Sequence, residues 1–417
     1  MKILFLVKFY QPFDRGGSEW STHDLARLLV KKGHQVTILT PNYGAKKKEI
    51  IEGIAIYRMP FFKKLKDPKD QLTPWWTNNI FWFILSSLFC FWFVRRQKFD
   101  IIHIHSNEFV PAGVISSILS GKPTVATFRD YQIICNLGFC LWKSVKACNW
   151  RQYLKNDFSF FYKNYVINKN SHKFLLLFAA AVRARIFQKF LYFFAQKVDY
   201  KIAVSKKVAD IFKANGLSNL QVIHNVVDIK LKPSAKSSNQ IIYVGRLSKG
   251  KGVDLICECL PEIFEKIPHA FLKIIGSGYL APILTETIEK HNLKSKVVSS
   301  GQLPHDAVLK LLRDAGLVIV PSLWPEPLPR AAIEAIVLGI PVVATNVGGI
   351  TEVVKDNLYG ILAEPTKESL KSAVINGFYQ KDQFKKNILR DLAKIRKHFS
   401  IDCILAYEKI YQSARTL

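Results

Sequence analysis

The sequence predicts an α/β protein in which two doubly wound, Rossmann-like parallel-sheet domains face each other across a cleft, and two observations indicate the paired sheets. Short apolar stretches alternate with longer amphipathic ones along the 417 residues. The short stretches are apolar throughout, as strands are when helices cover both faces of a parallel sheet. The alternation runs through two successive sets, and this length suffices for two domains of ordinary size.

Each set of strands is expected to be parallel and to be followed by helices. The first set is predicted at Ile3–Val7, Gln35–Leu39, Asp100–His105, Thr124–Phe128, Lys201–Val204 and Gln221–His224. The second set is predicted at Ile241–Gly245, Phe271–Ile275, Val297–Ser300, Leu317–Val320 and Pro341–Ala344. We expect one domain at residues 1–203, a second at 204–400 and a last helix at 401–417. A stretch rich in Lys, Pro, Ser and Asn, Lys230–Gln240, precedes the second set.

Composition favours a folded, basic protein. Apolar residues make up 49% and charged residues 22% of the chain, which excludes extended disorder. The formal net charge is +28, and residues 1–200 carry more than their share of it. Such an excess suits an anionic lipid surface or another polyanion, or reflects a generally basic proteome. The sequence has no zinc finger or aromatic RNA-binding signature, so we expect no nucleic-acid partner.

Two segments favour contact with a membrane surface. Ile80–Val94 is apolar, carries seven Phe or Trp residues and is followed by Arg95 and Arg96, but it is too short to cross a bilayer. Apolar and basic residues alternate in Phe174–Tyr200, as in a basic surface helix. The alternative is that both segments pack in a core or a domain interface. Seven cysteines, an odd number, and the absence of a secretory signal at the N-terminus favour the cytoplasm, with peripheral contact at the inner face of the cell membrane.

The strongest functional pattern is Glu326–Glu334, which follows the predicted strand Leu317–Val320. Two prolines extend the chain and start a helix, whose first amides form an anion site. Glu326 lies in the loop, where it can bind sugar hydroxyls, and Glu334 lies about one turn into the helix, where it can bind a ribose. The alternative is a solvated loop acid followed by a favourable helix N-terminal acid.

Three further clusters follow predicted strands, where parallel sheets bind ligands. Gly245–Gly252 places Arg246 and Lys251 where they can neutralise a departing diphosphate. No Asp-x-Asp pair exists to hold a divalent metal, so the two cations are expected to substitute for it. Gly348 and Gly349 open a second set of backbone amides, and Gly16-Gly17-Ser18-Glu19 does the same after the first strand.

Together these clusters resemble the retaining, metal-independent GT-B glycosyltransferases usually called family 4. The similar segments are Gly16–Glu19, Ala203–Ser205, His224–Asp228, Gly245–Gly252, Glu326 with Glu334, and Gly348–Glu352. The resemblance implies a UDP- or GDP-linked sugar as donor substrate, no cofactor, and a C-terminal helix that returns to the acceptor-side first domain. The catalytic residues would be Arg246, Lys251 and Glu326. The full donor-binding set would be Gly16, Gly17, Arg246, Lys251, Glu326, Leu328, Pro329, Arg330 and Glu334.

The sequence departs from this family on the acceptor side. Many members carry a His-Asp pair after the strand that is Thr124–Phe128 here, whereas this chain has Arg129 and Asp130. Arginine does not titrate near neutrality and so cannot act as a general base. We expect Arg129, Asp130 and His105 to line the acceptor side, although a structural role is an alternative for His105 and His103.

One loop carries Cys135, Cys140 and Cys148. Their spacing is not that of a zinc site, and loop-shaping or free thiols are the preferred interpretation over a three-thiol metal site. We therefore expect no metal site in this chain.

The expected function is transfer of a sugar to a polysaccharide or lipid-linked glycan at the cytoplasmic membrane face. The alternatives are a non-catalytic sugar-nucleotide binder and a Rossmann-type epimerase or oxidoreductase. The chain lacks a complete glycine fingerprint for a dinucleotide, which counts against the last alternative.

Overall fold

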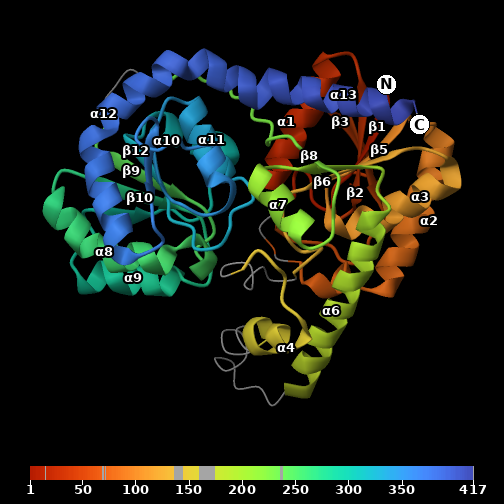
Figure 1. The fold of residues 1–417 in the computed structure, drawn as a ribbon, viewed down its shortest axis with the longest axis horizontal. Helices are drawn as coiled ribbons and strands as arrows, with labels where there is room; N and C mark the ends of the chain where they lie inside the picture. Colours follow the sequence, from red (N-terminus) through yellow and green to blue (C-terminus); the bar gives the residue numbers. More distant parts are fainter. Residues whose placement is uncertain are drawn as a thin grey trace. The chain divides into compact units, whose positions relative to one another are not determined.

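A computed structural model describes residues 1–14, 16–67, 70, 72–135, 144–158, 174–234 and 238–416. The chain forms two compact units, Met1–Val226 with Cys403–Leu417, and Val227–Asp402. Figure 1 shows the parallel strands and covering helices of each unit.

The first unit is built on an eight-stranded sheet of order β3-β4-β2-β1-β5-β6-β7-β8. All neighbouring strands are parallel except β3 and β4, which are antiparallel. Its strands are β1 Lys2–Leu6, β2 Gln35–Pro41, β3 Lys48–Ile51, β4 Ile54–Met59, β5 Ile101–Ile104, β6 Thr124–Phe128, β7 Tyr200–Ala203 and β8 Leu220–Val222. Its helices are α1 Gly17–Lys31, η1 Pro74–Trp76, α2 Ile80–Gln97, η2 Asn107–Phe109, α3 Val110–Ser120, α4 Trp150–Gln152, η4 Tyr153–Phe158, α6 Phe174–Gln196, α7 Lys206–Ala214 and α13 Cys403–Arg415.

The second unit has a six-stranded, fully parallel sheet of order β11-β10-β9-β12-β13-β14. Its strands are β9 Gln240–Val244, β10 Phe271–Ile275, β11 Val297–Ser299, β12 Leu317–Val320, β13 Val342–Thr345 and β14 Gly360–Ala363. Its helices are η6 Lys249–Lys251, α8 Val253–Lys266, α9 Ala281–Lys290, α10 His305–Arg313, α11 Arg330–Val337, η7 Gly348–Glu352, α12 Lys367–Lys397 and η8 His398–Asp402.

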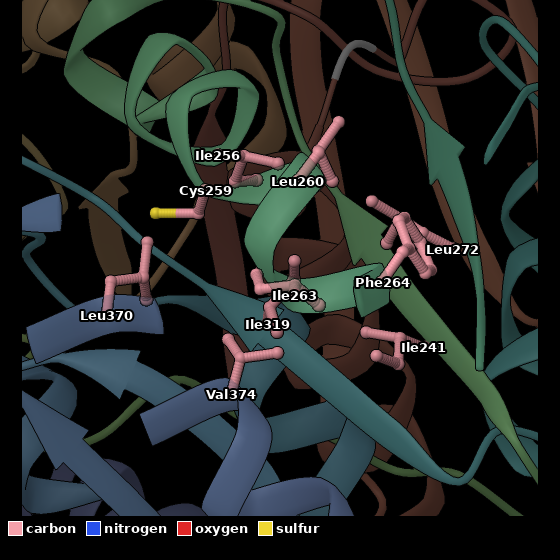
Figure 2. Close-up of a pocket in the computed structure, with 10 residues that line it drawn as sticks. All are labelled: Ile241, Ile256, Cys259, Leu260, Ile263, Phe264, Leu272, Ile319, Leu370 and Val374. Carbon is pink, nitrogen blue, oxygen red and sulfur yellow. The ribbon is translucent and has the colours of Figure 1, made fainter. Parts of the chain in front are cut away.

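Strand order in the second sheet reverses between β9 and β12, which is where doubly wound sheets bind ligands. The core beneath this edge is tightly packed. Figure 2 shows a small cavity of about 10 Å³ among apolar side chains of α8, the neighbouring strands and α12. A void of this size barely holds one water molecule, so we attribute it to packing rather than to ligand binding.

The terminal helix α13 completes the core of the first unit. Ile404, Tyr407 and Tyr411 pack with Phe5 of β1 and Ile101 of β5. The sequence boundary at residue 203 lies too early, because α7 and β8 extend the first sheet and the unit continues to Val226.

Helix α2 has two different faces. Trp82, Cys90 and Phe93 are buried, whereas Phe81 and Leu88 are 76% and 64% exposed. One face of this segment therefore packs in the core, and the opposite face is exposed. In the part of the chain that the structure describes, no helix combines the length and the apolar character needed to cross a membrane.

Candidate functional site

The loop after β9 is held against the loop after β12. Gly252 has a φ of 68°, and a Cβ at this position would lie 1.8 Å from the carbonyl oxygen of Pro321. The amide of Leu323 donates a hydrogen bond of 2.9 Å to the carbonyl of Gly250. Glycine is needed here because both the backbone conformation and the close approach exclude a side chain. The contact brings Lys251 to the residues that follow β12.

Lys251 and Glu326 form an ion pair at this edge of the sheet. The Lys251 ammonium donates to Oε1 of Glu326, which also accepts a 2.5 Å hydrogen bond from the Ser322 hydroxyl. Only 4% of the Glu326 side chain is exposed, against 24% of Lys251. Burial opposes the charge of Glu326, but Lys251 and the Ser322 hydroxyl outweigh it and hold the pKa of Glu326 below its usual range.

Arg246 follows β9 in the same loop as Lys251 and is exposed. Its carbonyl accepts a 2.8 Å hydrogen bond from the Tyr243 hydroxyl. Burial raises the pKa of Tyr243, the charge of Glu326 adds to that rise, and the charge of Arg246 opposes it. Both charges act on one buried phenol, and Arg246, Lys251 and Glu326 lie at the same edge of the second sheet. We call these three residues, with Arg330 and Glu334, the second-unit cluster.

The segment from Glu326 to Glu334 leads into α11 as the sequence predicts. Leu328 is buried, and Pro329 has the extended conformation of a helix N-cap. The amides of Ala332 and Ile333 donate to the carbonyl of Pro329 at 3.2 and 3.3 Å. The Ile333 bond is the first i→i−4 bond of the helix, so among the first helical amides Ala332 is one that is paired.

Glu334 is held by two nitrogen atoms. Nε of Arg330 lies 2.6 Å and Nε2 of His305 lies 2.7 Å from its Oε1. Burial opposes the charge of Glu334, but Arg330 and His305 outweigh it and lower the pKa of this carboxyl. The carboxylate is therefore ionised and fixed in orientation.

The loop Gly348–Glu352 supports Glu326 through the backbone. Gly348 has a φ of 64°, and a Cβ there would lie 2.2 Å from the carbonyl oxygen of Glu326. The amide of Gly349 donates a 2.6 Å hydrogen bond to the same oxygen. The sequence suggested that this amide binds a ligand, but in the structure it donates to the backbone of Glu326.

In the first unit, polar side chains gather after β1, β5 and β6. Gly16 and Gly17 are exposed at the start of α1, and Glu19 lies one turn into the helix. Burial raises the pKa of Glu19, and the nearby Arg129 guanidinium opposes that rise. The glycine loop and Arg129 therefore lie at the same edge of the first sheet.

Arg129 fixes the proton position on His105. Nη1 of Arg129 donates to Nδ1 of His105 at 2.8 Å, and Nε donates to Asn225 Oδ1 at 3.2 Å. Because arginine only donates, His105 carries its proton on Nε2. Burial, His103 and Arg129 all lower the pKa of His105 well below its usual value. His105 is accordingly a neutral imidazole.

His103 has a structural environment. Its two ring nitrogens lie 2.6 Å from the Tyr411 hydroxyl and 2.8 Å from Thr127 Oγ1. The ring therefore links β5 to α13 and β6. Of the two alternatives for this residue, the structure supports the structural role.

Asp130 belongs to a second group of contacts at the same edge. Its Oδ1 accepts hydrogen bonds from Asn107 Nδ2 at 2.6 Å and from the Gln132 amide at 2.9 Å. Glu108, adjacent to Asn107, pairs with Lys8 at 2.5 Å. Burial, together with the Glu108 charge, raises the pKa of Asp130 to about 6. We call Lys8, His105, Asn107, Glu108, Arg129 and Asp130 the first-unit cluster.

Sequence reasoning missed several partners of the predicted residues: Lys8, Asn107, Glu108, His305 and Ser322. Lys8, Asn107 and Glu108 follow predicted strands, and this position could have identified them as candidate site residues. His305 opens α10, and no local pattern connects it with Glu334.

Cys135 and Cys148 are buried, and Cys140 lies outside the described residues. Among the residues that the structure describes, no group of three or more His, Cys, Asp or Glu side chains could hold a metal ion.

Two family models match successive parts of the chain. Residues 15–231 match the model of Glycosyltransferase Family 4, and residues 228–389 match that of glycosyl transferases group 1. An uncharacterized glycosyltransferase of Methanocaldococcus jannaschii is 25% identical, over 88% of this chain and 85% of its own. One component of human phosphatidylinositol N-acetylglucosaminyltransferase is 28% identical, over 91% of this chain and 68% of its own.

Solved structures share the fold over nearly the whole chain. The Anabaena protein HepE, solved in complex with UDP and glucose, has a TM-score of 0.67 at 18% identity and covers 100% of both chains. Sucrose-phosphate synthase from Thermosynechococcus elongatus has a TM-score of 0.69 at 16% identity, with 99% and 98% covered. These likenesses assign the GT-B fold.

Proposed function

Because this chain belongs to Glycosyltransferase Family 4, we propose that it transfers a sugar from a nucleoside diphosphate to a polysaccharide or lipid-linked glycan with retention at the anomeric carbon. The observation that carries the proposal is the meeting of Arg246, Lys251 and Glu326 at the switch point of the second sheet. Transfer of the sugar leaves negative charge on the departing diphosphate, and fixed cations at that place lower the barrier.

In this proposal the members of the second-unit cluster bind different parts of the donor. Arg246 and Lys251 neutralise the leaving diphosphate without a metal, and Glu326 binds sugar hydroxyls while it orients Lys251. Glu334 binds the ribose, since Arg330 and His305 hold it ionised. Leu328, Pro329 and Arg330 supply backbone contacts.

The first-unit cluster is proposed to bind the acceptor. The acceptor oxygen bonds to the anomeric carbon on the face that the phosphate leaves, and its proton passes to the leaving phosphate. Arg129 steadies phosphate charge, with neutral His105 behind it. Asp130 orients the acceptor hydroxyl, and its raised pKa suits a group that binds a hydroxyl near neutral pH.

Two relatives narrow the substrates in this proposal. HepE was solved with UDP and glucose, which supports a UDP-linked sugar as the donor. The human relative is named for transfer to phosphatidylinositol, which supports a lipid acceptor.

Peripheral membrane contact at the cytoplasmic face is proposed on the exposed stripe of α2. Phe81, Ile84, Leu88 and Trp92 follow one another at helical spacing and are all about half exposed or more, and Arg95 and Arg96 follow them.

A panel of UDP, GDP and ADP tests the donor site by thermal shift. The expected result is a stabilisation by one of them, which Arg246→Ala reduces. With the matching sugar nucleotide, Arg246→Ala should slow donor turnover by about 10²-fold or more. Stabilisation without any turnover would instead identify a sugar-nucleotide binder.

A further inference from the structure

A large apolar hollow of the first unit lies between the start of α2 and α6 and is distinct from both polar clusters. It has a volume of about 760 Å³. Its walls include Phe62, Trp75, Trp76, Phe81, Phe187 and Phe190. We call it the α2–α6 groove; the two helices are labelled in Figure 1. Nothing in the proposed chemistry of sugar transfer uses these side chains.

One cation lies on this apolar wall. Arg183 of α6 is the only charged side chain on the groove walls within the described part of the chain. Its guanidinium lies 4.2 Å from the centre of the Trp75 ring, and Nη1 donates to the carbonyl of Asn78 at 3.2 Å. Burial lowers the pKa of Arg183, which nevertheless stays protonated. A cation in this setting gains from an anion that arrives with an apolar body.

The groove opens towards the exposed apolar residues of the same helices. Phe81 belongs both to its wall and to the exposed stripe of α2. Ile186 lines the groove and is 63% exposed, and Phe193 lies two turns further along α6 with Lys197 5.0 Å from its ring centre. Apolar residues flanked by lysines suit the surface of an anionic bilayer. The groove is therefore accessible from the face that we propose to contact lipid.

The inner wall of the groove packs against the turn η2, which carries Asn107 and Glu108 of the first-unit cluster. The ring of Trp82 lies 5.4 Å from that of Phe109, edge to face. Phe109 ends the turn η2, whose Asn107 donates to Asp130. One rigid turn thus separates the groove from the carboxylate that we place against the acceptor hydroxyl.

We propose that the α2–α6 groove binds the hydrocarbon chain of a phosphate-bearing lipid acceptor, with Arg183 contacting the phosphate. The lipid enters from the bilayer, its chain lies among the aromatic walls, and its polar end reaches towards Asp130. That the bound lipid is the acceptor rests on the proposed glycosyl transfer. The binding of a phosphate-bearing lipid in the groove does not depend on turnover.

Calorimetric titration of the full chain with dodecyl phosphate, below its micellar concentration, tests the inference. Dodecyl maltoside provides the same chain without the anion. Dodecyl phosphate is expected to bind with a negative heat-capacity change, because apolar surface is buried. Arg183→Gln should weaken dodecyl phosphate about tenfold and leave dodecyl maltoside unchanged. Arg183→Lys keeps the charge and should lose less affinity than Arg183→Gln.

Ile186→Glu tests whether the groove binds the hydrocarbon chain of the amphiphile. This side chain is 63% exposed, so the change is tolerated by the fold, yet it places a charge in the groove. We expect weaker binding of both amphiphiles, by about tenfold or more. The matched control is Ile118→Glu on α3, since Ile118 is 68% exposed and does not line the groove. Wild-type affinity for dodecyl phosphate in Ile186→Glu would overturn the proposal, as would equal effects in the control.

The same variants separate this inference from the proposed function. Arg183→Gln and Ile186→Glu should keep the nucleotide thermal shift and donor hydrolysis of the wild type. Lipid binding with no nucleotide effect in the wild type would overturn the acceptor role and the glycosyl transfer together. Nucleotide turnover with unaltered amphiphile binding in the groove variants would overturn only the groove.

Discussion

Each carboxylate of the second-unit cluster is buried beside its own cation. Glu326 pairs with Lys251, and Glu334 with Arg330. Removing one member of such a pair leaves an uncompensated buried charge and costs about 3–5 kcal/mol of stability. To separate an effect on catalysis from an effect on folding, a variant that removes one member of a pair must be compared with one that also neutralises its partner.

Lys251→Ala should reduce donor turnover by about 10²-fold or more, because one diphosphate cation is lost. It should also lower the free energy of unfolding, since Glu326 stays buried and ionised. Adding Glu326→Gln should restore much of the stability but not the turnover. Denaturant unfolding and donor hydrolysis measure the two effects. Full turnover in a folded Lys251→Ala protein would exclude its proposed role.

Asp130 gives stability a specific pH dependence. Its folded pKa of about 6 lies above the usual aspartate value, so the folded state binds the proton more tightly than the unfolded state. Its contribution is present below the unfolded pKa and is lost as pH rises through about 6.

Asp130→Asn should therefore flatten this part of the stability curve and raise stability at pH 7 by about 1–3 kcal/mol. The hydrogen bonds from Asn107 and the Gln132 amide survive, because the asparagine carbonyl can accept both. Urea unfolding from pH 4 to pH 7 is the measurement. An unchanged slope would show that Asp130 does not titrate in this range. Activity should fall in the same variant if Asp130 orients the acceptor.

At the scale of elements, three loops position the second-unit cluster, and glycine lets two of them approach closely. The carbonyls of Pro321 and Glu326 occupy the places where side chains of residues 252 and 348 would lie. These contacts explain why the loops that follow β9, β12 and β13 form one edge.

Gly252→Ala should shift the loop after β12 and reduce both stability and donor binding. Gly301→Ala is the matched control, since Gly301 has a similar φ of 63° but no atom within 4 Å of the added Cβ. The control should lose about 1 kcal/mol from backbone strain alone. Gly252→Ala should lose clearly more, and its nucleotide thermal shift should shrink. Equal losses in both variants would mean that the close approach to Pro321 has no energetic weight.

Most strands could be predicted, in their order along the chain, because buried parallel strands are continuously apolar. Thr124–Phe128, Phe271–Ile275 and Leu317–Val320 agree residue for residue. The hairpin of β3 and β4 was missed, since Lys48 and Glu49 interrupt an edge strand that needs no apolar face. Likewise, the positions of Arg246, Lys251 and Glu326 followed from strand ends, whereas Ser322 and His305 became partners only through packing.

At the scale of the whole molecule, charge and exposed apolar residues combine in the first half of the chain. The net charge is +28, and α2 and α6 carry exposed aromatic and aliphatic side chains. Basic residues near an anionic surface each contribute about 1 kcal/mol, and salt screens this contribution.

Sedimentation with vesicles of phosphatidylcholine and phosphatidylglycerol should therefore capture the protein at low salt and release part of it as salt increases. Leu88→Glu, on the exposed stripe of α2, should weaken capture about tenfold or more. Ile283→Ser provides the control, because Ile283 is 45% exposed on α9 of the second unit. Vesicle binding that changes neither with salt nor in Leu88→Glu would contradict a membrane-facing α2.

The return of α13 to the first unit has a consequence for synthesis. Residues 227–402 form one uninterrupted stretch, whereas the other unit needs both the first 226 residues and Cys403–Leu417. Chains grow from the N-terminus, so the unit translated second is the one that can fold first. Until Tyr407 and Tyr411 emerge from the ribosome, the apolar faces of β1 and β5 lack their cover. A released chain that ends at Asp402 should accordingly protect its second unit from protease while its first unit is still cleaved.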